Sequence, residues 1–177
     1  MTPSLYDLDP GPQTPEVVRM VVEIPKGSSH KYEYSKELGA FRLDRVLYSP
    51  VHYPGDYGFI PGTFASDGDP LDALVLAEDP TFTGCVVEIR PVGMLKMVDQ
   101  NKNDQKIIAV LNHDPVYQQV HTLDQIYPHL RRAIEHFFNI YKELEGRDTS
   151  TLGWGDPIEA RNLIAETRKA YLARNGG

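Results

Sequence analysis

The chain has little cysteine, little tryptophan and no long run of apolar residues. Cys85 is its only cysteine among 177 residues, so no disulfide can form within the chain, which fits a reducing compartment. No hydrophobic run approaches the roughly 20 residues that a membrane-spanning helix needs. The opening segment, MTPSLYDLDPGPQTPEV, has neither a basic start nor an apolar core and is not typical of a secretory signal. We therefore expect a cytoplasmic protein with no membrane partner.

Positive charge is also scarce. There are 18 lysines and arginines against 25 acidic residues, and the formal net charge is −7. Nucleic-acid binders gain affinity by neutralising phosphates with lysine and arginine, so this balance argues against a nucleic-acid partner. The six histidines form no His-Glu-x-x-His motif, and a single cysteine cannot build a Cys/His cluster, which argues against a zinc site of those types.

The length and composition are those of one globular domain, residues 1–177, and the proline-rich, polar residues 1–15 predict an N-terminal arm. From there to about residue 112 the pattern indicates strands, at 17–24, 41–48, 72–76, 85–98 and 107–111. The fourth segment is long, and its Pro91 and Gly93 predict a bend. Because turns and not helices separate these segments, a closed or nearly closed antiparallel barrel is favoured over a parallel sheet.

The last third of the chain changes to helical spacing. Apolar residues recur every three or four positions at Leu130, Ile134, Phe137, Phe138, Tyr141 and Leu144. Gly146 is placed to end this first helix. A second helix is predicted to begin with Asp156 as N-cap, Pro157 at its first position and Glu159 completing a capping box. The expected fold is mainly β with α: a small barrel flanked by two C-terminal helices.

Three aspartates stand directly before an apolar strand in the segment FASDGDPLDALVL. In an extended chain Asp67 and Asp69 share a face and Asp72 does not, so the chain must turn for all three to converge. The glycine and the proline between them favour such a turn. Oxygen ligands suit hard divalent cations such as Mg²⁺. The segment therefore predicts a metal site, with a solvated acidic turn as the alternative.

A calcium-binding loop of the helix–loop–helix type is a second alternative for this segment, because Glu78 falls at its twelfth position. The match fails at Leu71, where that loop needs a ligand, and at Asp72, where it needs glycine. The spacing is thus not typical of that motif.

Further polar residues occur near the ends of other predicted strands. In KMVDQNKNDQKIIAV, Asp99 follows one strand and Asp104 precedes the next, with Lys106 two residues later. Alone this is typical of a polar hairpin loop, but it repeats the placement of carboxylates at a strand end. The remaining candidates, each of which could also be a surface or packing residue, are Glu23, Lys31, Glu33, Arg45, Tyr53, Tyr57, Tyr141 and Lys142.

Taken together, the motifs EIP, KYE, DR, YPGDYGFIP, DGDPLD and FFNIYK make the sequence resemble the bacterial-type family I soluble inorganic pyrophosphatases. The resemblance extends from about residue 17 to the C-terminal helix. It implies a five-stranded OB-type closed barrel and a homo-oligomer, usually a hexamer. The implied activity is hydrolysis of pyrophosphate to two orthophosphates by a metal-bridged hydroxide that attacks phosphorus. The implied cofactor is Mg²⁺, several per active site, with Mn²⁺ or Zn²⁺ as substitutes.

The resemblance also implies a role for each candidate residue. The metal ligands are Asp67, Asp72, Asp99, Asp104 and Glu23, with Asp72 bridging two ions. The catalytic residues are Asp69, which takes a proton from the attacking water, Tyr57 and Arg45. The phosphates are held by Lys31, Arg45, Tyr57, Lys106, Tyr141 and Lys142. Glu33 and Tyr53 support these ligands. The sequence departs from the family pattern in two loops. Gln100 stands where relatives commonly carry an acidic residue, and Arg147 lies in a region where relatives have lysines.

The charges of the candidate residues agree with this function. Seven carboxylates and four cationic side chains leave the set at −3, and a polyanionic substrate would be repelled at close range. Divalent ions would reverse that sign. Two other functions remain as alternatives: hydrolysis of another phosphoanhydride, although no glycine-rich nucleotide loop is present, and binding of single-stranded nucleic acid, for which the net charge has the wrong sign.

Overall fold

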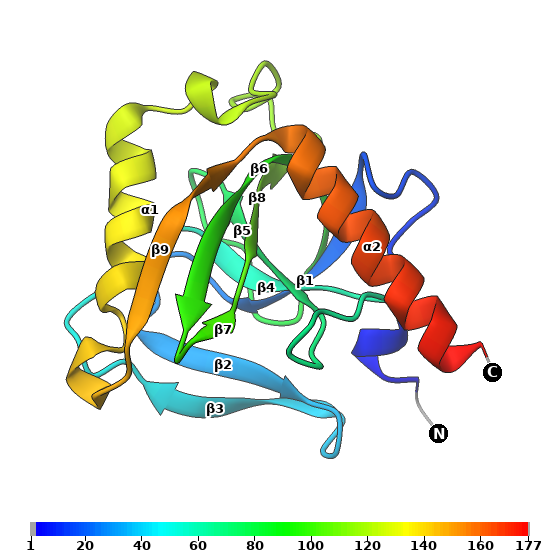
Figure 1. Cartoon of the computed structure of the whole chain (residues 1–177), viewed down its shortest axis with the longest axis horizontal. Coiled ribbons are helices and arrows are strands. Elements are labelled where there is room, and N and C mark those ends of the chain that lie inside the picture. The colour runs from blue at the N-terminus through cyan, green and yellow to red at the C-terminus, as the bar shows by residue number, and fades with distance from the viewer. Residues whose placement is uncertain (1–2, 177) are drawn as a thin grey trace.

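Five strands form a ring in this structure, a computed structural model that describes residues 3–176. Each strand is hydrogen-bonded to the next in the order β1, β4, β5, β8, β6, and β6 pairs with β1 to close the ring. Their bounds are Val18–Ile24, Asp56–Ile60, Leu71–Leu76, Lys106–Leu111 and Val86–Asp99, respectively. The predicted mainly β fold with two C-terminal helices is confirmed (Figure 1).

The prediction that the strands are all antiparallel is wrong for one pair, since β5 and β8 run parallel. The reason is the strand order. β6 follows β5 in the sequence but does not pair with it; β6 pairs antiparallel with one edge of β8, and β5 pairs with the other edge of β8. The parallel register places Asp72 beside Lys106. The bend predicted in β6 is present, as a register shift between Pro91 and Gly93.

Four further strands complete the fold, and sequence patterns predicted only part of them. β2 (His30–Ser35) and β3 (Ala40–Val46) form a separate two-stranded sheet, which lies below the ring in Figure 1. β7 (Lys102–Asn103) and β9 (Thr149–Gly155) both pair with β6. Neither β9 nor the ring strand β4 was predicted from the sequence.

Both α-helices of the described chain cover the sheet. α1 (Pro128–Ile140) packs beside β9, and α2 (Pro157–Asn175) packs against β6. The capping box that opens α2 is confirmed: Asp156 accepts from the Glu159 amide at 2.8 Å, and Glu159 accepts from the Asp156 amide at 2.9 Å. The predicted end of α1 at Gly146 is wrong, because the helix stops at Ile140 and Gly146 ends a separate 3₁₀ turn.

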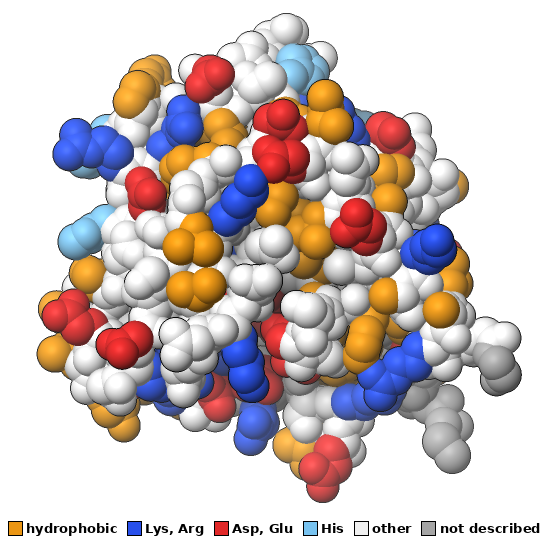
Figure 2. Space-filling view, viewed as in Figure 1, with side chains coloured by type: hydrophobic (Ala, Val, Ile, Leu, Met, Phe, Trp, Pro, Cys, Tyr) orange, Lys and Arg blue, Asp and Glu red, His pale blue; other side chains and the backbone are white. Residues whose placement is uncertain are grey.

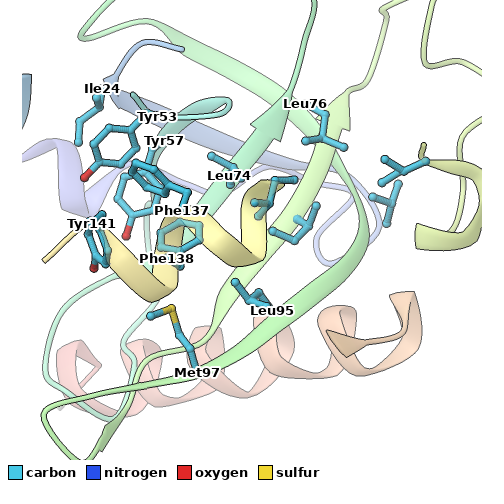
Figure 3. Packing of buried hydrophobic residues seen from close by; sticks show 14 of the residues in the cluster. Ile24, Tyr53, Tyr57, Leu74, Leu76, Leu95, Met97, Phe137, Phe138 and Tyr141 are labelled. Carbon is cyan, nitrogen blue, oxygen red and sulfur yellow. The ribbon is translucent and has the colours of Figure 1, made fainter. Parts of the chain in front are cut away.

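Strand alternation divides the buried side chains between two cores. On β5, Leu74 and Leu76 join a cluster with the phenylalanines of α1 (Figure 3), whereas Ala73 and Val75 join a cluster with Ile164 of α2. Because both faces of the strand are covered, its residues after Asp72 are continuously apolar. Within residues 3–176, no helix is both long and apolar enough to cross a membrane.

Candidate active site

A cavity of about 240 Å³ lies beside the ring, and twelve of the fourteen predicted site residues line it. Figure 2 shows acidic side chains in a hollow below the centre of this face, with basic side chains beside it. The twelve come from β1, β2, β4, β5, β8, the end of α1 and the connecting loops: Glu23, Lys31, Glu33, Tyr53, Tyr57, Asp67, Asp69, Asp72, Asp104, Lys106, Tyr141 and Lys142. Arg45 and Asp99 do not line this cavity.

The loop before β5 turns as its glycine and proline predicted, and brings the three aspartates to the cavity. Gly68 has φ +94° and donates its amide to the Ala65 carbonyl at 3.0 Å. The Asp69 amide donates to Asp67 Oδ1 at 3.0 Å. Burial, together with the charges of Asp67 and Asp72, raises the pKa of Asp69. A raised pKa makes this carboxylate a stronger proton acceptor than an ordinary aspartate.

Lys106 lies at the centre of the polar network. Its Nζ donates to Tyr57 Oη at 2.7 Å, to Asp72 Oδ2 at 2.8 Å and to Asp104 Oδ1 at 2.7 Å. Burial alone would lower the pKa of Lys106, but the two carboxylates raise it well above its ordinary value. Burial raises the pKa of Asp104. Three cavity residues from different elements are therefore held by one ammonium group.

Asp99 is joined to the cavity through Lys142, with which it forms a close ion pair. Burial would raise the pKa of Asp99, but the hydrogen bond and charge of Lys142 lower it. Burial lowers the pKa of Lys142 itself. Asp99 also lines an adjoining cavity together with Asp67 and Asp104, which border both spaces. The two acidic clusters of the sequence thus meet.

The β2–β3 hairpin presents cationic side chains that are already paired. Lys31 and Arg45 are cross-strand partners, and Asp44 lies between them, with Oδ2 at 3.3 Å from Lys31 Nζ and 2.7 Å from Arg45 Nη1. Arg45 also contacts Glu145, whose side chain is buried. Sequence reasoning missed Asp44 and Glu145. The only signal was for Asp44, which is the acidic residue of the quoted DR motif.

Glu23 is almost completely buried at the cavity wall. Burial raises its pKa to about 8, although its Oε1 accepts a hydrogen bond from the Tyr34 amide at 2.9 Å. Glu33, which also lines the cavity, has its Oε2 3.7 Å from Lys31 Nζ on the same strand. The Glu23 carboxylate is buried and that of Glu33 is partly exposed, as expected for groups with different roles.

Three buried tyrosines join the apolar core to the polar site. The rings of Tyr53, Tyr57 and Tyr141 pack around the phenylalanines of α1, with the Tyr53 and Phe137 centroids 4.8 Å apart. Their hydroxyl ends lie together at one edge of the cluster in Figure 3. Burial raises the pKa of each hydroxyl, so these groups remain protonated and can donate hydrogen bonds. Core packing and an anion-binding role are therefore compatible.

The donor set fits a hard divalent cation. The predicted ligands are all carboxylates, which hard cations such as Mg²⁺ prefer. Within residues 3–176, no three acidic, histidine or cysteine side chains are close enough together to hold one ion. Lys106 pairs with Asp72 and Asp104, and Lys142 pairs with Asp99.

Comparison with known proteins places the chain among related enzymes. A profile of the inorganic pyrophosphatase family matches residues 20–172. The inorganic pyrophosphatase of a Nostoc species is 48% identical over 162 residues, covering 92% of this chain and 96% of the relative. That of Methanosarcina acetivorans is 47% identical over 160 residues, with 90% and 95% covered.

A solved structure agrees with the sequence comparisons. The crystal structure of inorganic pyrophosphatase from Thermus thermophilus superimposes with a TM-score of 0.93 at 43% identity, covering 96% of this chain and 99% of that one. The family resemblance seen in the motifs is thereby confirmed. The chain belongs to the family I inorganic pyrophosphatases, enzymes that hydrolyse pyrophosphate.

Proposed function

We propose that this chain hydrolyses pyrophosphate to two orthophosphates in a Mg²⁺-dependent reaction within the cavity described above. The observation that supports this most directly is the meeting of carboxylates with Lys31, Lys106 and Lys142 in one cavity. A cavity with both charge types suits a polyanionic substrate that arrives with divalent cations. Neither charge type would suffice alone.

In this proposal the carboxylates and the lysines exchange partners. Asp67, Asp72 and Asp99, with Asp104 and Glu23, would hold Mg²⁺, which when bound polarises phosphoryl oxygens and lowers the pKa of water. Lys106 and Lys142 would then leave their aspartates and bind phosphate oxygens. Charge on the leaving phosphate is stabilised by such cations.

The remaining side chains orient the substrate and move a proton. Asp69 would accept the proton of the attacking water, a role that suits its raised pKa. The hydroxyls of Tyr57 and Tyr141 would donate hydrogen bonds to the phosphates. Lys31 would contact them from the hairpin, joined by Arg45 once that side chain leaves Asp44 and Glu145. Glu33 and Tyr53 would hold these groups in place.

The first prediction is that phosphate release from pyrophosphate requires a divalent cation. Purified protein should release phosphate with Mg²⁺, lose the activity in excess EDTA, and recover it when Mg²⁺ is restored, because the site's excess of carboxylates over cationic side chains otherwise repels the substrate. Mn²⁺ and Zn²⁺ should substitute with altered rates. ATP serves as the control substrate and should be hydrolysed far more slowly. Full turnover in metal-free buffer would overturn the proposal.

The second prediction concerns assembly. We propose a homo-oligomer, a hexamer as the resemblance to bacterial members implies, working in the cytoplasm without nucleic acid or membrane. Large apolar side chains remain exposed on the single chain, among them Phe82 at 66% and Tyr127 at 84%, which leaves apolar area for contacts between copies. Light scattering at micromolar concentration should give a mass of about six chains. A single monomer peak would contradict this prediction.

A further inference from the structure

The N-terminal segment contributes a side chain to the cavity. Tyr6, in the short 3₁₀ turn η1 (Leu5–Asp7), lines it together with the predicted residues. Its ring lies edge-to-face on Tyr34, with centroids 5.1 Å apart, and on Phe59, with centroids 4.8 Å apart. No family motif quoted above includes this residue, and no sequence pattern pointed to a role for it.

Two hydrogen bonds fix Tyr34 to this segment. Tyr6 Oη donates to the Tyr34 carbonyl at 3.0 Å, and the Leu5 amide donates to Tyr34 Oη at 3.3 Å. The amide of the same Tyr34 donates to Glu23 Oε1 at 2.9 Å. Tyr34 therefore lies between Tyr6 and the Glu23 carboxylate. Tyr6 contacts both the ring and the backbone carbonyl of Tyr34.

The other contacts of Tyr6 lead to the aspartates. Phe59 is the cross-strand partner of Asp72 in the β4–β5 pair, and the Tyr6 carbonyl accepts from the Gly62 amide at 2.8 Å. Gly62 has φ +64° and begins the connection that leads to Asp67 and Asp69. The segment thus supports the cavity wall from two sides.

We propose that Tyr6 is a positioning residue of the active site: it fixes Tyr34 and thereby the orientation of the Glu23 carboxylate at the cavity. This inference rests on the proposed function, since Glu23 has a role there only if the site binds pyrophosphate with cations. The competing role for Tyr6 is packing alone. Leu8 provides the comparison, because it packs on the same Val21–Tyr34–Phe59 cluster and does not line the cavity.

The experiment compares the full-length variants Tyr6→Ala, Tyr6→Phe, Leu8→Ala, Glu23→Gln and the double variant Tyr6→Ala/Glu23→Gln. Binding of methylenediphosphonate, a non-hydrolysable pyrophosphate analogue, is measured by calorimetry at saturating Mg²⁺, alongside KM and kcat for pyrophosphate. Thermal unfolding without ligand reports the structural cost of each change. Tyr6→Phe keeps the ring and remains informative if Tyr6→Ala does not fold.

Tyr6→Ala should weaken analogue binding and raise KM by about tenfold, the lower end of the effect expected for groups that orient ligands, with a smaller change in kcat. Tyr6→Phe should show part of this loss. Leu8→Ala should lower Tm without changing binding. In the Glu23→Gln background, Tyr6→Ala should weaken analogue binding by less than about a further twofold, because the effects of residues that act through one another are not additive.

Two outcomes separate this inference from the proposed function. If the wild type hydrolyses pyrophosphate and Glu23→Gln weakens analogue binding, but Tyr6→Ala and Tyr6→Phe bind as the wild type does, the role of Tyr6 is overturned and the proposed function is kept. The same conclusion follows if Tyr6→Ala keeps its full effect in the Glu23→Gln background. If the wild type neither binds the analogue nor hydrolyses pyrophosphate, both proposals fail.

Discussion

Replacing Lys106 with methionine is expected to lower kcat/KM for pyrophosphate by about 10²–10³-fold, the loss typical of removing one group that stabilises transition-state charge. The same change should tighten the binding of Mg²⁺ to the substrate-free protein. In the structure Lys106 pairs with both Asp72 and Asp104, so under the proposed function its ammonium group competes with a divalent cation for these oxygens. Removal of the ammonium group favours the cation.

The stability of the metal-free Lys106→Met variant should fall although its Mg²⁺ affinity rises. Without Mg²⁺, Lys106→Met leaves two carboxylates facing each other in a partly buried site, which should reduce the free energy of unfolding by about 3 kcal/mol. Saturating Mg²⁺ should restore most of this loss, because a ligand that binds the folded state stabilises it. Calorimetric titration and denaturant unfolding with and without Mg²⁺ measure both effects.

Lys96→Met is a matched control for this prediction. Lys96 lies on β6 and pairs with Glu159 at 2.7 Å, but both side chains are well exposed, and such pairs contribute about 0–1 kcal/mol. Neither activity nor Mg²⁺ affinity should change in this variant. Equal Mg²⁺ affinity in Lys106→Met and the wild type would refute the competition between lysine and cation.

The parts of the fold that local sequence predicts are those in which short-range chemistry decides the structure. The buried run that became β5, the capping box at Asp156 and the bend at Pro91 each depend on a few adjacent residues. β9 could not be predicted in this way. Exposed and partly buried positions alternate only in its first four residues, and it becomes a strand because the long β6 offers it an edge. Such long-range pairing overrides weak local preference.

The same distinction applies to the candidate site. Residue types and motifs identified twelve of the side chains that line the cavity, but not Tyr6 and not the ion pairs among them. The contact between Lys106 and Asp72 follows from the parallel β5–β8 register, which no local pattern indicates. Arg45 was predicted to hold substrate and is instead paired with Asp44 and Glu145, which come from its own strand and from the turn after α1. Its substrate role stays a prediction.

The aspartates of the DGDPLD segment should differ in what their loss does. Asp72→Asn should weaken Mg²⁺ binding as well as turnover, because Asp72 is proposed to bridge two ions and a neutral amide is a poorer bridge between dications. Asp69→Asn should instead lower kcat by about 10²–10⁴-fold at saturating Mg²⁺, the usual contribution of a general base. Its Mg²⁺ titration should shift less than that of Asp72→Asn.

The physical reason lies in the environments of the two carboxylates. Asp72 is held by Lys106 at 2.8 Å, whereas Asp69 has its pKa raised by burial and by its acidic neighbours Asp67 and Asp72. A carboxylate with a raised pKa binds a proton more readily, which suits the acceptor of a proton from water. Without it the pH–rate profile should move to higher pH, because hydroxide must then form with less help from the protein.

Phosphate release measured across pH and Mg²⁺ concentration distinguishes the two roles. Asp124→Asn is the control, since Asp124 is 93% exposed and pairs only with Arg131 among the ion pairs of residues 3–176; it should behave as the wild type does. A near-normal kcat of Asp69→Asn at saturating Mg²⁺ would mean that its defect is one of metal binding. In that case Asp69 belongs with the metal ligands, and another group must accept the proton.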